Sequence, residues 1–290
     1  MSLVSPTTVY RFSDGTITET PDLLAVEEPL EIRLGYGPAT DRQQRAIAVT
    51  MRTPGHDVEL ALGFLFTEGV ISRREHVLSA RHCSREEAEK GNVIRVELQP
   101  DLLLDWAMLD RHGITASNCG VCGKTSIDAI RTSCPAPVSG TFHLDSATLM
   151  TLPDQLRTRQ RAFAHTGGLH AAALVGPDGQ LGAVREDIGR HNALDKLLGI
   201  TFWNNSIGVE AERDTAVQQA VLVSGRIGFE LVQKSWMAGI PMLIALGAPS
   251  SLAVDLAREA GITLVGFLKA DRYTLYTYPE RVFGAELVTS

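Results

Sequence analysis

Hydrophobic and polar residues alternate in three stretches of the first hundred positions: EPLEIRL, RAIAVTMR and NVIRVEL. A period of two with many branched side chains predicts half-buried strands, so we expect a first sheet here. Between the second and third stretches, the segment RTPGHDVELALGFLFTEGVI is rich in apolar residues at helical spacing. It predicts a buried helix that Asp57 caps at its start and that ends at Gly69.

The pattern changes after residues 133–141, where Pro, Ser and Gly mark a boundary. A helical region through LRTRQRAF, expected to break near Pro153, leads into a hairpin of HAAALVG, the turn PDG and QLGAVRED. Helices and strands then alternate in the order GRHNALDKLLG, AVLVS, RIGFELVQKSWMAG, PMLIALG, SSLAVDLAREAG and ITLVGF. Strands separated by single helices predict an α/β fold with a largely parallel sheet and helices on its faces. We expect an α+β domain over residues 1–134 and an α/β domain over 135–290.

The composition excludes several classes of protein. Hydrophobic residues make up 44% and charged residues 21% of 290 positions, as in ordinary globular proteins. A formal charge of −7 argues against general binding to nucleic acid, which needs a positive surface. The first residues lack the features of a signal peptide and no apolar run is long enough for a membrane span, so we expect a cytoplasmic protein. In that compartment the four cysteines stay reduced, and the isolated Cys83 and Cys134 are expected to be buried.

Polar clusters follow the predicted strands, at the edge where sheets of this kind bind ligands. The stretch REDIGRHNALDK places six polar residues around one strand-to-helix turn: Asp187, Arg190, His191, Asn192, Asp195 and Lys196. The other clusters are TGGLH at residues 166–170, SGRIGFE with Ser224, Gly225 and Arg226, and GFLKADRY with Phe267, Lys269 and Arg272.

Each cluster taken alone also fits a structural role, as a capped helix, a turn or an exposed loop. Their convergence on one edge predicts a site for a nucleotide-sized polyanion, with arginines and helix amino ends as donors and Phe267 as a stacking surface. The chain has neither a Walker loop nor a G-x-G-x-x-G fingerprint, so ordinary ATPase or nicotinamide-dinucleotide chemistry has no support.

The stretch NCGVCGKTS contains two cysteines, Cys119 and Cys122, that suit either half a zinc site or a reactive thiol. Structural zinc needs four ligands, and only Cys134 with a distant histidine could complete the set. A nucleophile is favoured, because the pair lies before a predicted helix start and beside Lys124, and both stabilise a thiolate. The glycine after each cysteine would let the loop swing.

As a set, the motifs resemble the formate dehydrogenase accessory sulfurtransferase family, FdhD. The resemblance rests on NCGVCG, TGGLH, REDIGRHNALDK, SGRIGFE, GAPSSLAV, GFLKADR, EPLEIR and RTPGHDVELALGFLFTEG. It extends from about residue 27 to 280. Asn118 departs from the small hydroxyl residue usual before the first cysteine, which leaves the thiol in place but puts the dynamics of the loop in doubt.

The resemblance implies a sulfurtransferase with Cys119 as the persulfide carrier and Cys122 as its helper. Sulfur would come from a cysteine desulfurase and pass to Mo-bis(molybdopterin guanine dinucleotide), or its tungsten form, for the catalytic subunit of formate dehydrogenase. A guanine nucleotide such as GDP would mimic part of this substrate, and a homodimer is expected.

The resemblance also implies a C-terminal cytidine-deaminase-like three-layer sandwich after a smaller α+β domain. The His-x-Glu and Pro-Cys-x-x-Cys pair that holds zinc in deaminases is missing, so no metal ligand is assigned. The implied cofactor-binding residues are Thr166, Gly167, Gly168, His170, Asp187, Gly189, Arg190, His191, Asn192, Ser224, Gly225, Arg226, Phe267, Leu268, Lys269, Ala270, Asp271 and Arg272. Two alternatives stay open, a non-catalytic cofactor chaperone and a zinc hydrolase of deaminase type.

Overall fold

The computed structural model describes residues 3–83, 91–100, 102–106, 135–138, 142–204, 207 and 219–284. The first half of the chain builds a four-stranded sheet in the order β4-β3-β6-β5. Its strands are β3 (Glu28–Tyr36), β4 (Gln43–Arg52), β5 (Val77–His82) and β6 (Val93–Leu98). The three strands predicted from alternation are therefore confirmed. Strand β5 was not predicted, because only the first of its six residues is buried and it carries little apolar pattern.

Helix α1 (Asp57–Thr67) confirms the helix predicted between β4 and β6. The proposed cap is wrong, because His56 occupies the N-cap position and Asp57 is already helical. The Asp57 carboxylate instead accepts two hydrogen bonds from the fully buried guanidinium of Arg52, at 3.0 and 3.1 Å. Gly69 follows the helix with φ of 75°, as expected of a residue that ends a helix.

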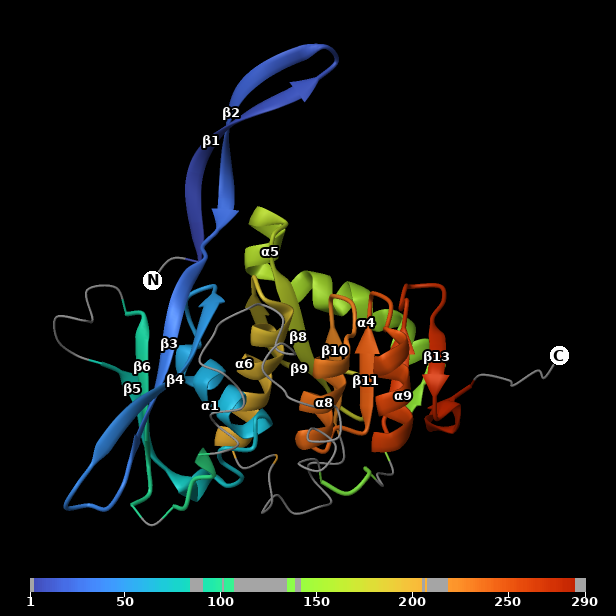
Figure 1. Ribbon diagram of the computed structural model, residues 1–290. Helices are drawn as coiled ribbons and strands as arrows, with labels where there is room; N and C mark the ends of the chain where they lie inside the picture. Colours follow the sequence, from blue (N-terminus) through green and yellow to red (C-terminus); the bar gives the residue numbers. More distant parts are fainter. Residues whose placement is uncertain are drawn as a thin grey trace.

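A long hairpin of β1 (Val4–Ser13) and β2 (Thr16–Ala25) projects from the body of the molecule (Figure 1). The sequence pattern did not predict it. In the register of the two strands, Phe12 lies opposite Ile17 and Tyr10 lies opposite Glu19. Since residues two apart share a face, Tyr10, Phe12 and Ile17 stand on one side of the ribbon, and each is more than two-thirds exposed.

The second half of the chain builds a six-stranded sheet in the order β13-β12-β11-β10-β8-β9. The strands are β8 (His170–Val175), β9 (Leu181–Asp187), β10 (Ala220–Val223), β11 (Met242–Ala245), β12 (Thr263–Gly266) and β13 (Thr274–Thr277). Strands β10, β11 and β12 are parallel, as predicted, and the flanking strands are antiparallel. A short pair, β7 (Leu144–Asp145) with β14 (Val282–Phe283), and the 3-10 helices Arg74–His76 and Pro279–Arg281 complete the described elements.

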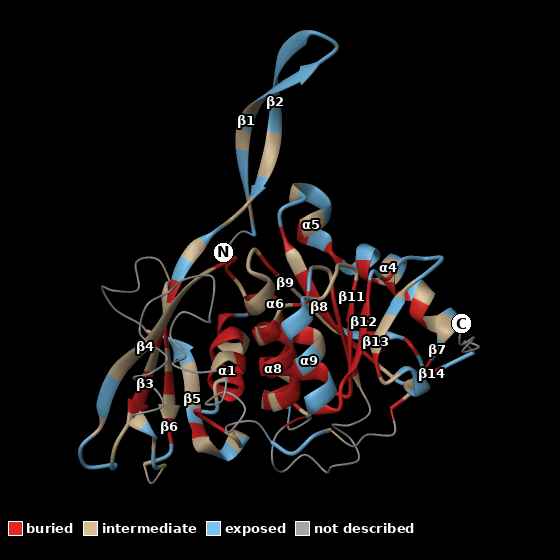
Figure 2. Cartoon of the chain, turned by 45° about the vertical axis from the view of Figure 1, so that its right-hand side comes forward, coloured by how far each residue is buried: buried red, intermediate tan, exposed pale blue. Residues whose placement is uncertain are grey.

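Helices cover both faces of this sheet, which gives the expected three layers (Figure 2). Alternate residues of β8 enter different cores: Ala172 and Leu174 pack with α6, α8 and α9, whereas Ala171 and Ala173 pack with α4. The helices are α4 (Ser146–Arg159), α5 (Arg161–Thr166), α6 (Arg190–Trp203), α8 (Phe229–Met237) and α9 (Ser251–Ala260). The α/β fold class is therefore confirmed.

The break expected near Pro153 does not occur, because α4 continues through this residue to Arg159. Asp145 caps the helix by accepting hydrogen bonds from two backbone N–H groups. Leu149, Leu152 and Leu156 bury one face of it against the sheet. This packing outweighs the hydrogen bond that proline removes, and the chain turns only at Gln160.

The two halves of the chain meet where α1 crosses α6. A Cβ atom on Gly199 would lie 1.8 Å from the carbonyl oxygen of Glu59, and one on Gly63 would lie 1.8 Å from that of Asp195. Only glycine allows helix backbones to approach this closely. One hydrophobic core runs from the four-stranded sheet through α1 and α6 to the six-stranded sheet. Within the described residues no helix combines the length and apolar character needed to cross a membrane.

Candidate functional site

The strand order brings the predicted motifs to one edge of the six-stranded sheet. Strand β8 runs antiparallel to its neighbours β9 and β10, and β10, β11 and β12 run parallel to one another. The last residues of β9, β10, β11 and β12 therefore all lie at this edge. β8 begins at the same edge with His170. The REDIGRHN, SGRI and GFLKADR motifs and the end of TGGLH therefore lie along the same edge of the sheet, although they are far apart in sequence.

Ser224 and Gly225 lie against the start of β8. The backbone N–H of Ser224 donates to the carbonyl of Ala171 at 2.9 Å, and the Ser224 hydroxyl accepts from the N–H of Ala171 at 2.9 Å. A Cβ atom on Gly225 would lie 3.1 Å from Nδ1 of His170. The His170 ring thus packs on the backbone of the SGRI turn, and a larger residue at position 225 would push it away.

The charges around His170 are mostly positive. Burial lowers the pKa of this imidazole below its usual value, and Arg190, His191 and Arg226 lower it further, while Asp187 opposes them. His170 is therefore largely neutral near pH 7. A half-buried imidazole whose pKa is lowered by two arginines and a histidine indicates a place where an anion would be stabilised.

Arg190 and His191 open helix α6 at this edge. In the described part of the chain, Nε of Arg190 is buried and has no hydrogen-bond partner. Since buried polar groups in native proteins are nearly always paired, this donor is a reason to look for a ligand. His191 is held by Glu230 of α8, with Nε2 to Oε2 at 2.7 Å.

Asp187 and Asn192 were predicted to bind the ligand, but their side chains are engaged within the protein. Asp187 meets Nζ of Lys196 at 2.8 Å and accepts from the N–H groups of Gly189 and Thr53. Nδ2 of Asn192 donates to the same carboxylate at 3.2 Å. These contacts fix the backbone of Gly189 just before Arg190.

The end of β4 also supports this turn, which the sequence did not indicate. Asn192 donates to the carbonyl of Met51 at 2.7 Å and accepts from the hydroxyl of Thr50, and Lys196 donates to the carbonyl of Thr53 at 2.8 Å. Asp195, part of the same polar cluster in sequence, faces away and binds Lys234 at 3.0 Å.

Three backbone hydrogen bonds hold the loop after β12, two of them to the end of β11 and the turn after it and one within the loop. Phe267 and Leu268 donate backbone hydrogen bonds to the carbonyls of Gly247 and Ala245, and Lys269 donates to that of Arg272 at 2.8 Å. Phe267 adopts φ of 52°, which is rare for a bulky residue, and 47% of it is exposed. Leu268 is buried in the core, whereas Lys269, Ala270, Asp271 and Arg272 are exposed.

Gly247 is a site residue that the sequence reasoning missed. A Cβ atom there would lie 2.9 Å from the carbonyl oxygen of Gly225 and 3.0 Å from the backbone nitrogen of Arg226. Its absence lets the turns after β10 and β11 pack together. A glycine at the end of a predicted strand, in PMLIALG, was the available signal.

Thr166, Gly167 and Gly168 form the end of α5. Gly167 is left-handed with φ of 65°, and the Thr166 hydroxyl donates to the carbonyl of Ala162 and accepts from the N–H of Gly168. These contacts are those of a helix terminus. The turn ends at Gly168, two residues before His170.

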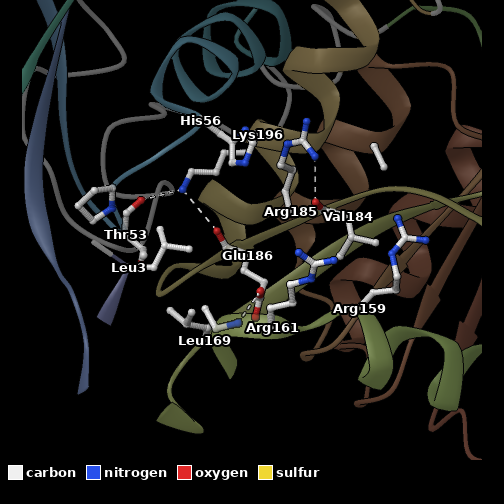
Figure 3. A pocket seen from close by; sticks show the side chains of 13 residues that line it. Leu3, Thr53, His56, Arg159, Arg161, Leu169, Val184, Arg185, Glu186 and Lys196 are labelled. Atoms are coloured by element: carbon white, nitrogen blue, oxygen red, sulfur yellow. Dashed lines mark hydrogen bonds between the residues drawn. The ribbon is translucent and has the colours of Figure 1, made fainter. Parts of the chain in front are cut away.

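A cavity of 370 Å³ lies beside this edge, around the outer side of β9 (Figure 3). Most of its cations are already engaged: Arg159 donates to the carbonyls of Leu181 and Gly182, and Arg185 binds Glu59. Burial raises the pKa of Glu59, but hydrogen bonds from His56 and Arg185 outweigh it and leave the pKa below its usual value. These side chains protect the free edge of β9.

Cys119, Cys122 and Cys134 lie outside the described residues. Cys83 is described and is partly exposed, so its expected burial is only partial. In the described residues no three His, Cys, Asp or Glu side chains gather as ligands for a metal ion.

The described residues define an α/β protein of the three-layer sandwich class, with a cluster of cations at its strand ends and a small sheet attached. Comparison with known proteins shows that the chain belongs to the FdhD/NarQ family, whose model matches residues 25–283. It is 45% identical over 279 residues to the sulfur carrier protein FdhD of Streptomyces coelicolor, covering 94% of each chain. It is 48% identical over 281 residues to the protein of the same name from Mycobacterium tuberculosis, covering 94% of this chain and 96% of the relative.

A solved structure has the same fold. It is that of a protein described as a formate dehydrogenase accessory protein from Desulfotalea psychrophila, with a TM-score of 0.73 at 24% sequence identity. The match covers 97% of this chain and all of the other.

Proposed function

We propose that this protein is a sulfurtransferase that supplies sulfur to the molybdenum or tungsten bis-guanine-dinucleotide cofactor of formate dehydrogenase. The observation that carries the proposal is the gathering of Arg190, His191 and Arg226 around His170, in a chain whose relatives are named sulfur carrier protein FdhD. A diphosphate-bearing ligand suits this edge, whereas a neutral small molecule would leave the charge of Arg190, whose buried Nε has no partner among the described residues, without an anion.

The residues present fit such a ligand as substrate. Arg190 offers a buried Nε without a hydrogen-bond partner among the described residues, and Arg226 of the SGRI turn is exposed. Arg190, Arg226 and the amino end of α6 would hold the diphosphates, and Phe267 would stack on a base. The metal centre of the cofactor is the sulfur acceptor.

The sulfur would arrive as a persulfide. The Cys119 thiolate attacks the terminal sulfur of a cysteine persulfide on the desulfurase, a new S–S bond forms at Cys119, and the desulfurase cysteine leaves as a thiolate. Such exchange is fastest when the attacking thiol has a pKa near the ambient pH. Cys122 would resolve the product or assist by exchange.

The partners in this proposal are a cysteine desulfurase as donor and the catalytic subunit of formate dehydrogenase as the final recipient. We further propose that the protein works as a homodimer in the cytoplasm.

A GDP titration by calorimetry tests where the nucleotide binds. Arg226→Ala and Arg190→Ala should each weaken GDP by roughly tenfold or more, because each removes a charge-assisted contact to phosphate. Arg258→Ala is the matched control, since Arg258 is an exposed arginine of α9 paired with Asp255. Unchanged affinity in both site variants would show that the pocket lies elsewhere.

Intact-mass analysis tests the transfer itself. After incubation with a cysteine desulfurase and cysteine, the wild type and Cys122→Ser should gain one sulfur atom per chain, and Cys119→Ser should gain none. A wild type that binds GDP but gains no sulfur would be a chaperone. Stoichiometric zinc that is lost when either cysteine is replaced would favour the hydrolase.

A further inference from the structure

Thr53 follows the last residue of β4, is 1% exposed, and directs all of its polar groups to the connection between β9 and α6 and to α6 itself. Its backbone N–H donates to Oδ2 of Asp187 at 3.1 Å, and its hydroxyl accepts from the N–H of Ile188 at 3.2 Å. Its carbonyl accepts from Nζ of Lys196 at 2.8 Å (Figure 3). One residue of the first half of the chain thus contacts three residues of the second half around a single turn.

That connection leads directly to Arg190. Strand β9 ends at Asp187 and α6 begins at Arg190, so two residues lie between them. The N–H of the first, Ile188, is held by the Thr53 hydroxyl. The N–H of the second, Gly189, donates to the Asp187 carboxylate at 2.8 Å, and Thr53 holds the other oxygen of that carboxylate. The point at which Arg190 leaves the sheet edge therefore depends on Thr53.

The side chain of Arg190 needs this support. Its Nε is buried without a hydrogen-bond partner among the described residues, so this nitrogen does not help to fix the guanidinium before a ligand arrives. Groups that bind a ligand must be held within about 0.5 Å of their productive positions by the contacts behind them. Loss of the hydrogen bond to Ile188 would release one of the two amides of the connection, and a shift of the backbone there is passed on to Arg190.

A buried threonine can also serve stability alone, and Thr67 provides the comparison. It is likewise 1% exposed and also joins the two halves of the chain. Its hydroxyl donates to Asp195 at 3.0 Å and accepts from Nζ of Lys234 at 2.8 Å. Both threonines therefore contribute to the packing of α6, but only Thr53 contacts the connection that precedes Arg190.

We propose that Thr53 is a positioning residue for anion binding, which acts by holding Ile188 and thereby placing Arg190. The inference rests on the proposed function, since it requires that Arg190 binds a diphosphate. It adds that a residue of the first half of the chain, which also carries the cysteines, sets the geometry of the nucleotide site in the second half.

GDP titration by calorimetry on Thr53→Val, Thr53→Ser and Thr67→Val tests the inference. Valine keeps the shape of threonine but cannot accept from Ile188, whereas serine keeps the hydroxyl. Thr53→Val should weaken GDP by about tenfold, and Thr53→Ser should stay within about twofold of the wild type. Thr67→Val should lower the urea midpoint of unfolding, because it removes two buried hydrogen bonds, and leave the affinity for GDP unchanged.

A double-mutant cycle shows whether Thr53 acts through Arg190. Once Arg190→Ala has removed the guanidinium, its placement no longer matters, so adding Thr53→Val should change the affinity by less than about twofold. A role in stability alone would not produce this coupling. An equal weakening by Thr53→Val in the presence and absence of the arginine would overturn the inference.

The remaining outcomes separate the inference from the proposed function. Wild-type affinity in Thr53→Val would overturn the inference and leave the nucleotide site intact. So would a Thr67→Val variant that binds GDP as weakly as Thr53→Val does. An Arg190→Ala variant that binds GDP as the wild type does would remove Arg190 from the nucleotide site, and this inference would fail with it.

Discussion

Replacing Gly199 by alanine should destabilise the protein through the crossing of α1 and α6. The added Cβ would lie 1.8 Å from the carbonyl oxygen of Glu59, whereas ordinary contact begins at 3.4 Å. The helices must therefore separate by about 1.6 Å, because the obstacle is helix backbone and cannot rotate aside. That separation would loosen the buried core on both sides of the crossing.

The magnitude follows from two opposing effects. Overpacking of a well-packed core costs about 1–3 kcal/mol, and a clash with backbone belongs at the upper end. Alanine in place of a helical glycine returns up to ~1 kcal/mol. We expect a net loss of about 2 kcal/mol in the free energy of unfolding, a large part of the roughly 5–15 kcal/mol typical of native proteins.

Urea unfolding followed by circular dichroism measures this loss. Gly182→Ala is the control, since a Cβ atom there has ordinary contacts with the Cβ of Leu174 at 3.5 Å and with its carbonyl oxygen at 4.0 Å, and the change should stay within about 0.5 kcal/mol. Gly63→Ala should cost about as much as Gly199→Ala. The double variant should cost less than the sum, because one separation relieves both clashes. A Gly199→Ala variant as stable as the wild type would refute the close crossing.

Three further outcomes are expected. The lowered pKa of Glu59 stabilises the folded state above the unfolded-state pKa near 4.5, and this stability is lost as the pH falls through the folded-state pKa. Glu59→Gln should therefore reduce the loss of unfolding free energy measured with urea between pH 3 and 6. A variant with the same pH profile as the wild type would contradict this prediction. Arg52→Met removes the buried guanidinium that pairs with Asp57 and leaves His82, with Nε2 at 3.3 Å, as the remaining contact of that carboxylate among the described side chains. It should cost about 3–5 kcal/mol in the same assay, so a loss below about 1 kcal/mol would show that the Arg52–Asp57 pair is dispensable. Binding of GDP should raise the lowered pKa of His170, so GDP should bind more tightly as the pH falls from 7.5 to 6. The accompanying proton uptake is measured by calorimetry in two buffers, and His170→Gln should lose the pH dependence of the affinity. A wild-type affinity that does not change with pH would argue against an anion beside the His170 ring.

The inner strands of the six-stranded sheet were predictable because β8, β10, β11 and β12 are almost entirely buried. The edge strand β13, which is mostly exposed or half-buried, was not predicted. AVLVS and PMLIALG read as strands without reference to any partner, and the turns after them carry the polar residues of the site. The β1–β2 hairpin was not predictable in this way. Most of its residues are exposed, so neither face carries a buried pattern.

The motifs of the candidate site could be predicted from the sequence, but the contacts of their individual side chains could not. Sequence grouped Asp187, Asn192 and Asp195 with Arg190, since all four lie within nine consecutive positions of the chain. The structure turns Asp195 toward Lys234 and joins Asp187 to Thr53, a residue more than a hundred positions away. Long-range pairs of this kind leave no local signal in one sequence.

The crossing of α1 and α6 also limits how the molecule can work. Gly63 and Gly199 are in backbone contact, and Lys196 joins Asp187 to the end of β4. These contacts between the described residues hold the two sheets together and oppose a hinge motion that would separate them. Under the proposed function, the cysteine desulfurase and the catalytic subunit of formate dehydrogenase would both bind to one rigid body. The sulfur atom would then be moved by the cysteine that carries it and not by a movement of one sheet relative to the other.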